Sequence, residues 1–106
     1  MDSVEERRLV LQETLEDILG SGNVYFDPPE NLRMQYPCLR YTRAKHMPTF
    51  ADNMPYKGVT AYEIIYITRE VRSTEMIGAL MAIPYCTHSR HYVADNLHHD
   101  VFDVYV

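Results

Sequence analysis

The chain has 106 residues, of which 46% are hydrophobic, and this is enough to predict one domain, residues 1–106, with a single core. Its formal net charge of −5 argues against a dedicated nucleic-acid-binding protein, because the affinity of such proteins comes mainly from neutralising phosphates. No apolar run has the roughly 18 residues of a membrane-spanning helix, and the acidic start of the chain is unlike a secretory signal. We therefore expect a cytoplasmic protein without a membrane partner.

A first helix is predicted from Val4 to Leu19. The sequence Ser3-Val4-Glu5-Glu6 has the form of a capping box, in which the serine hydroxyl accepts a hydrogen bond from the amide three residues later. Apolar residues then recur at helical spacing, and Gly20 supplies a stop signal. We expect this amphipathic helix to cover the core.

Two short strands are predicted next. The run Asn23-Val24-Tyr25-Phe26 is followed by Asp27-Pro28-Pro29, and since proline has no backbone N–H to donate, this strand is expected at an edge of the sheet. After a connector, Cys38–Arg43 has the alternation of a second strand.

A long segment, Ala44–Gly58, separates this strand from the next one. Ordinary hairpin loops have about two to five residues, and longer ones are commonly functional. The segment contains four large apolar side chains with only its own short flanks to bury them: Met47, Phe50, Met54 and Tyr56. We therefore favour a segment that binds a partner or self-associates over a loop folded back on its own domain.

The run Ala61–Arg69 predicts the central strand of the sheet, since its residues are mainly β-branched and aromatic. Both of its alternate sets contain apolar side chains, so both faces are expected to be covered. Helices would cover one face, and a second layer or a neighbouring subunit would cover the other.

A second helix is predicted between Arg72 and Ile83, with Ser73 as its N-cap and Pro84 at its end. Gly78 either weakens this helix or allows it to pack closely on the first one.

Two final strands, Tyr85–Val93 and Val101–Val106, are predicted around a turn at Ala94-Asp95-Asn96. The predicted fold class is therefore α+β. An antiparallel sheet of about four to five strands carries two helices in the order α-β-β-β-α-β-β, with the long loop between the second and third strands.

Cys86, His88 and His91 are candidate metal ligands, but on a regular strand His91 would face away from the other two, and the spacing matches no established zinc pattern. No third orienting residue can be named for a Cys86–His88 nucleophile pair. His98-His99-Asp100 is interpreted as a turn that hydrogen-bonds its own backbone. We expect no enzyme, no catalytic residues, no cofactor and no metal. Cys38 and Cys86 are expected to be buried free thiols.

Charge is unevenly distributed along the chain. Residues 1–30 carry a net charge of −6 and residues 95–106 carry −3, whereas the block 31–57 carries +4. The positive residues of that block include Arg40, Arg43 and Lys45. Such a block could face an acidic partner or DNA.

Four stretches have a distinctive amino-acid sequence: Asn23–Pro29, Met34–Tyr41, Phe50–Asn53 with Tyr56, and Ile83–Phe102. In these stretches, and over almost its whole length, the chain resembles small proteins encoded in the head-to-tail and tail gene blocks of long-tailed bacteriophages. The order of its elements is similar to that of tail terminator and tail completion proteins. One departure is Arg69-Glu70-Val71-Arg72, where that family would have a turn rich in Asp and Pro.

The resemblance implies a virion structural protein, a tail terminator that forms a ring, usually sixfold, which caps the tail tube and joins it to the head connector. The implied partners are further copies of the chain, the tail tube protein and the head-tail connector proteins, with DNA passing through the ring without specific binding. The implied location is the tail or neck of the virion, and the host cytoplasm during assembly.

Subunit or tail-tube contacts are expected from the basic block and the long loop. The expected contact residues are Arg40, Arg43, Lys45, Met47, Phe50, Met54 and Tyr56. The alternatives are a head-completion adaptor, a minor tail protein or, from another class, a small phage enzyme or regulator.

Overall fold

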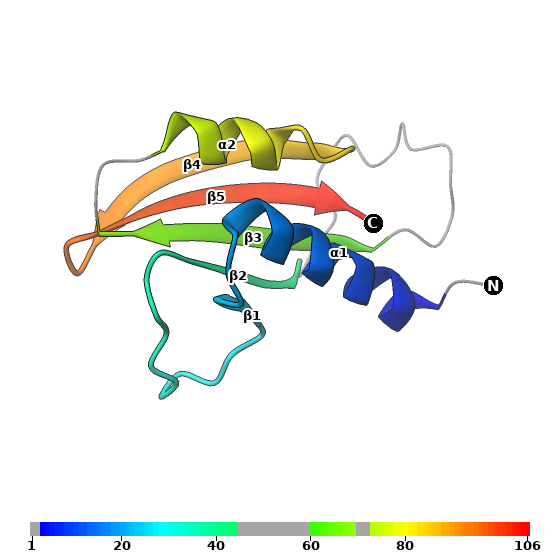
Figure 1. Cartoon of the computed structure of the whole chain (residues 1–106), viewed down its shortest axis with the longest axis horizontal. Coiled ribbons are helices and arrows are strands. Elements are labelled where there is room, and N and C mark those ends of the chain that lie inside the picture. Colours follow the sequence, from blue (N-terminus) through cyan, green and yellow to red (C-terminus); the bar gives the residue numbers. More distant parts are fainter. Residues whose placement is uncertain (1–2, 45–59, 70–72) are drawn as a thin grey trace.

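The computed structural model describes residues 3–44, 60–69 and 73–106, which form two helices and one five-stranded sheet (Figure 1). The elements in chain order are α1 (Val4–Leu19), β1 (Val24–Phe26), β2 (Cys38–Arg43), β3 (Ala61–Thr68), α2 (Thr74–Met81), β4 (Cys86–Ala94) and β5 (Leu97–Tyr105). The predicted α+β class and order of elements are confirmed. Residues 45–59, which make up most of the predicted long loop, lie outside the described residues.

Helix α1 begins and ends where its local signals predict. The Glu6 amide donates a hydrogen bond of 3.1 Å to the Ser3 hydroxyl, which caps the N-terminus. At the other end Gly20 has a φ of 79°, and its amide donates to the Glu16 carbonyl at 2.8 Å. A left-handed residue of this kind stops the helix, and glycine adopts that conformation without a steric penalty.

Helix α2 is shorter than predicted. Its N-cap is Ser73, as expected, because the Met76 amide donates to the Ser73 hydroxyl at 3.1 Å. The helix ends at Met81, ahead of the predicted end at Ile83. Pro84 keeps Ile83 out of the helix, since the residue before a proline is sterically disfavoured in the helical conformation. Ala82 is the C-cap, and its amide still donates to the Gly78 carbonyl.

The sheet has the strand order β1-β2-β3-β5-β4, so β3 is central and β1 lies at an edge, as predicted. The expectation of a wholly antiparallel sheet is wrong in one detail, because β1 pairs with β2 in parallel, with Val24 opposite Leu39. A tight hairpin would have made this pair antiparallel. The connection from Asp27 to Pro37 is instead long enough to return the chain to the end of the sheet where β1 began.

Strands β4 and β5 form a long hairpin with the predicted turn. Asp95 and Asn96 have φ values of 54° and 62°, as a two-residue turn with two left-handed residues requires. Strand β5 begins at Leu97 rather than at Val101, so the interpretation of His98-His99-Asp100 as a turn is wrong. These three residues are held in the strand because β3 pairs with them on one side and β4 on the other.

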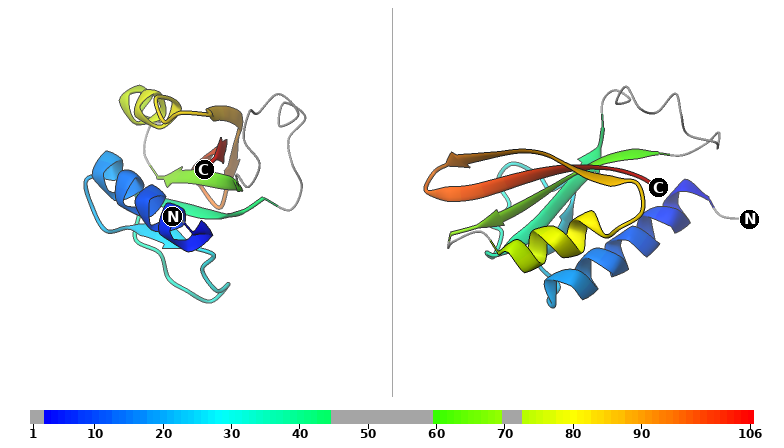
Figure 2. Two further views of the ribbon diagram at one scale, coloured as in Figure 1. Left: turned by 90° about the vertical axis from the view of Figure 1, so that its right-hand side faces the viewer. Right: turned by 90° about the horizontal axis from the view of Figure 1, so that it is seen from above.

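Both helices lie on the same face of the sheet, which Figure 2 shows from two further directions. The core forms between them and the sheet. Its fully buried members include Leu15 of α1, Leu80 of α2 and, from the strands, Leu39, Tyr41, Tyr62, Ile64, Phe102 and Val104. Neither of the helices in the described part of the chain is long and apolar enough to span a bilayer.

Candidate functional site

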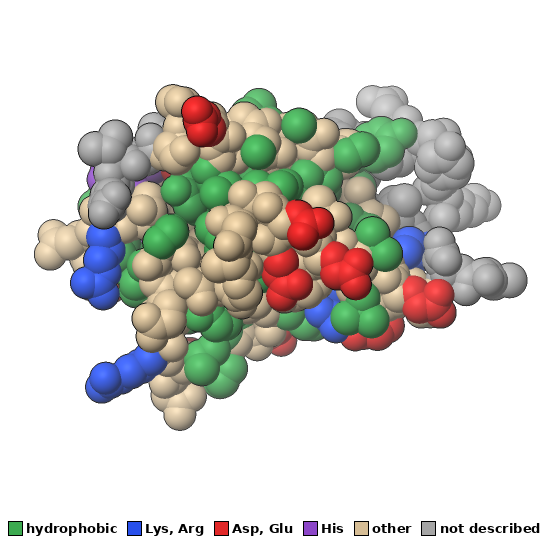
Figure 3. Space-filling view, in the orientation of Figure 1, with side chains coloured by type: hydrophobic (Ala, Val, Ile, Leu, Met, Phe, Trp, Pro, Cys, Tyr) green, Lys and Arg blue, Asp and Glu red, His purple; other side chains and the backbone are tan. Residues whose placement is uncertain are grey.

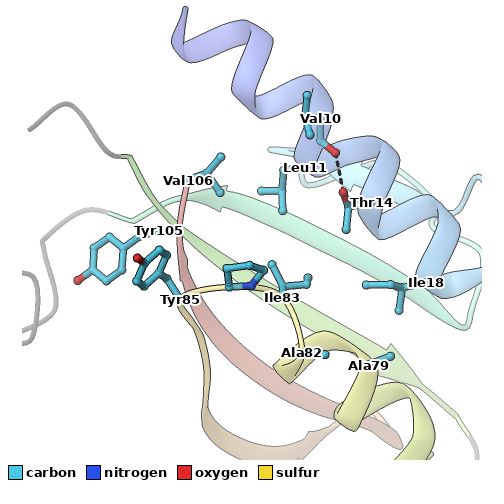
Figure 4. A pocket seen from close by; sticks show the side chains of 11 residues that line it. Val10, Leu11, Thr14, Ile18, Ala79, Ala82, Ile83, Tyr85, Tyr105 and Val106 are labelled. Carbon is cyan, nitrogen blue, oxygen red and sulfur yellow. Dashed lines mark hydrogen bonds between the residues drawn. The ribbon is translucent and has the colours of Figure 1, made fainter. Parts of the chain in front are cut away.

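A groove of about 460 Å³ lies between α1 and α2 on the helical face of the molecule (Figure 4). One wall is a face of α1 that carries Val10, Thr14 and Ile18, which are spaced four residues apart and therefore lie on one side of the helix. The other wall includes Ile83, and Val106 lies at the end of the groove. The Thr14 hydroxyl donates to the Val10 carbonyl at 2.9 Å, so this polar group of the wall is satisfied within the helix. The groove therefore presents mainly apolar surface.

Two hydrophobic side chains at the groove are exposed to solvent. Val10 is 63% exposed and Tyr85 is 52% exposed, and both line the groove. Figure 3 shows hydrophobic side chains gathered between the two helices on this face. Contiguous apolar surface of this kind usually marks a contact site for another molecule.

Tyr85 also has an unusual backbone. Its φ is 60°, a left-handed value that is sterically unfavourable for a bulky side chain. Two hydrogen bonds hold this corner: the Cys86 amide donates to the Ile83 carbonyl at 3.2 Å, and the Tyr105 amide donates to the Tyr85 carbonyl at 3.3 Å. Strained residues of this kind concentrate at functional sites, and this one places its ring at the groove.

Acidic side chains flank the groove. Glu6, Glu13 and Asp17 recur at helical spacing on the same flank of α1 as Val10, and all are exposed. Glu6 and Arg7 also line a smaller hollow of about 230 Å³ that includes Val10 and Val106. The surface therefore combines an apolar floor with a rim in which three acids outnumber one base, and this favours an apolar partner segment with basic flanks.

The β4–β5 hairpin carries a cluster of histidines on the helical face. The register of β4 shifts between His88 and Arg90, so His91 returns to the same face as His88, and the expectation that it lies on the opposite face is wrong. The physical reason is a β-bulge, which inserts an extra residue and restarts the alternation. His91 Nε2 lies 3.1 Å from His98 Nδ1, and the two rings are stacked with centroids 5.3 Å apart.

The candidate metal ligands Cys86, His88 and His91 do not point toward one common position. His88 Nε2 is engaged by Asp100 Oδ1 at 2.9 Å, whereas His91 contacts His98. Cys86 is buried, and burial raises the pKa of its thiol to about 11. Within residues 3–44, 60–69 and 73–106, no group of three or more His, Cys, Asp or Glu side chains is arranged to hold a metal ion.

Two of the contact residues expected from the sequence, Arg40 and Arg43, are described by the structure, and they lie on different faces of the sheet. Arg40 lies opposite Ile65 on the face of the sheet away from the helices, which we call the open face, and it is half-buried. Arg43 lies opposite Tyr62, whose side chain belongs to the core, so Arg43 is on the helical side at the exposed end of β2. The other expected contact residues, Lys45, Met47, Phe50, Met54 and Tyr56, lie outside the described residues.

Among the described residues, the side chains on the open face are buried to different degrees. Ala61 and Ile67 of β3 are buried there, but Glu63 and Ile65 are half-buried. Glu63 lies directly opposite Asp103 of β5, and like charges in this position destabilise a strand pair. Arg40 lies diagonally beside Glu63 on the same face and supplies a positive charge there.

Sequence reasoning did not find the groove. Its lining comes from α1, the end of α2 and the C-terminal residue, and these meet only in the folded chain. Val10, which lies between Glu6 and Glu13 on the acidic flank of the predicted helix, could have indicated the groove. An apolar residue on that flank does not face the core, so it indicates a contact surface instead.

Comparisons with protein-family models, with curated proteins and with solved structures each gave no match to this chain. The function is therefore inferred from the surfaces themselves and from the resemblance in sequence.

Proposed function

We propose that this protein is a virion structural protein of the tail-terminator type, whose subunits form a ring that caps a phage tail tube and joins it to the head connector. The observation that carries this proposal is the apolar groove with its acidic rim, which lies apart in the sequence from the basic block 31–57. A ring is built from head-to-tail contacts, so each subunit must offer two different and complementary patches. An acidic, apolar surface and a basic segment are such a pair.

The described polar groups favour a structural role over catalysis. Burial raises the pKa of both Cys38 and Cys86 to about 11, which keeps these cysteines as unreactive thiols at neutral pH. The prediction that the protein is not an enzyme therefore stays part of this proposal.

The test is the assembly state and its partner. Sedimentation of the purified chain at low salt is expected to give one closed oligomer, and electron microscopy is expected to show a ring at the end of tails to which the protein has been added. A chain that stays monomeric at all concentrations and binds no tail would overturn the proposal. A ring that binds isolated heads but not tails would assign the protein to head completion instead.

A further inference from the structure

We infer that the groove between α1 and α2 of one subunit receives the segment 45–59 of a neighbouring subunit. This inference rests on the proposed ring and names the contact from which the ring is built. The groove has an apolar floor and a volume of about 460 Å³, within the roughly 300–1,000 Å³ typical of sites that enclose a ligand. It can therefore take a few large side chains.

The sequence of the segment suits this groove. It carries four large apolar side chains between Lys45 and Lys57, with Asp52 as its single acid. The four are Met47, Phe50, Met54 and Tyr56. Methionine and aromatic residues are enriched in the cores of interfaces, and lysines at both ends of the segment complement an acidic rim.

The rim supplies the opposite charge. Glu6, Glu13 and Asp17 lie along one flank of α1 beside Val10, and Figure 3 shows acidic side chains over this helix. The sign of the rim disfavours an acidic partner, such as a nucleic acid, and favours a basic one. The segment 45–59 carries Lys45 and Lys57 against Asp52, so its net charge of +1 has the required sign.

The described residues leave the groove open, since Val10 and Tyr85 are both more than half exposed. The described residues that flank the segment are Ala44 and Thr60. The Thr60 amide donates to the Val106 carbonyl at 2.8 Å, and the Val106 amide donates to the Thr60 carbonyl at 2.9 Å. Val106 also lines one end of the groove, so Thr60 and the groove lie at the same end of the molecule, where a neighbour can contact both.

The first arm of the experiment uses a peptide, so that it does not depend on ring formation. A synthetic peptide of residues 44–58 is titrated into the whole protein by fluorescence anisotropy. Val10→Lys, which puts a positive charge on the apolar floor and repels the lysines of the peptide, is expected to weaken binding at least about tenfold. Val93→Lys is the matched control, since Val93 is 58% exposed and lies on the β4–β5 hairpin outside the groove, and it is expected to leave binding unchanged.

The second arm identifies the subunit that provides the segment. Chains carrying Val10→Cys are mixed with chains carrying Met54→Cys, and a short bifunctional thiol reagent is expected to join them into heterodimers, whereas Val93→Cys with Met54→Cys is not. One chain carrying both Val10→Cys and Met54→Cys, diluted until monomeric, is expected to show no internal cross-link.

The outcomes separate this inference from the proposed function. Rings that join tails without a Val10–Met54 cross-link would overturn the inference and leave the proposed function standing. Peptide binding that Val10→Lys weakens, in a protein that forms no ring, would overturn the proposed function. An internal cross-link in the diluted monomer, or peptide binding that is insensitive to Val10→Lys, would also overturn the inference.

Discussion

His88 Nε2 lies 2.9 Å from Oδ1 of Asp100, whose side chain has no exposed surface, whereas 26% of the His88 side chain is exposed. Removing the His88 side chain should therefore lower the free energy of unfolding more than neutralising Asp100 does. The reason is that the buried Asp100 carboxylate would lose its contact with this imidazole. We expect His88→Ala to lower the free energy of unfolding by about 2 kcal/mol and Asp100→Asn by about 1 kcal/mol. Urea denaturation at pH 7 measures both, and equal costs would contradict this account of the pair.

Tyr41 joins α1 to the sheet through a buried hydroxyl. This hydroxyl donates to Gln12 Oε1 at 2.6 Å and accepts from Arg8 Nη1 at 2.9 Å. Tyr41→Phe removes the donor to Gln12 Oε1 and the acceptor of Arg8 Nη1, and we expect a loss of about 2 kcal/mol in the free energy of unfolding. Tyr25→Phe is the matched control, because its hydroxyl accepts an exposed hydrogen bond from the Gln35 amide at 3.1 Å and should cost less than about 0.5 kcal/mol. Similar losses in the two variants would show that the buried network does not stabilise the fold.

Gly78 weakens α2 without a packing reason. A Cβ added at Gly78 would meet no atom within 4 Å, so the alternative that this glycine allows the helices to pack closely is not supported. Gly78→Ala should raise the free energy of unfolding by about 0.5–1 kcal/mol, since alanine loses less backbone entropy in a helix. Gly20→Ala is the contrasting variant, and it should destabilise the protein because the φ of Gly20 is 79°. Thermal unfolding of both variants provides the check, and a lower Tm for Gly78→Ala would contradict the prediction.

Local signals in the sequence predicted the elements that depend on them. Ser3 and Gly20 set the two ends of α1, and Ser73 caps α2, because caps act within a few residues of the chain. The central position of β3 followed from apolar side chains in both alternate sets of its residues.

Features that depend on distant pairing were not predicted. The bulge that turns His91 toward His98 exists only where β4 meets β5, and the parallel pairing of β1 depends on where β2 lies. The groove is the same kind of feature, since Val10 and Tyr85 come together only after folding. Secondary-structure propensity is a property of a single segment. The bulge, the parallel pairing and the groove each depend on how two or more segments meet in the fold.

Burial controls the chemistry of the two cysteines. It raises the pKa of Cys38 and of Cys86 from 9.0 to about 11, because the thiolate is poorly solvated inside the protein. The folded state therefore keeps these protons at a pH where the unfolded chain releases them, and stability should fall as the pH rises from about 9 to 11. The double variant Cys38→Ala/Cys86→Ala should lose less stability over this range than the native chain.

Urea denaturation at pH 8 and at pH 10.5 measures this difference. A thiol reagent at pH 8 should also label the unfolded protein and leave the folded one unlabelled. Rapid labelling of the folded protein, or a parallel decline of the native chain and the double variant, would contradict the prediction.

The last prediction separates the two arginines by surface. Arg40 is half-buried on the open face of the sheet, where Glu63 is its diagonal neighbour, whereas Arg43 is exposed at the end of β2 on the helical side. If the basic block pairs with the acidic surface of a neighbour, the double variant Arg40→Glu/Arg43→Glu should weaken ring assembly. The effect should be largest at low ionic strength, where screening is least.

Single variants show which surface takes part. Arg43 is close enough to Glu5 of its own chain to lower the pKa of that carboxyl, after the larger effect of Arg8. Arg43→Glu therefore adds a local repulsion, and Arg43→Gln, which only removes the charge, is the control for it. We expect sedimentation at low salt to rank assembly as native, then Arg43→Gln, then Arg43→Glu, with the Tm of the monomer little changed because exposed charges contribute little to stability. Unchanged assembly in the double variant would remove Arg40 and Arg43 from the interface.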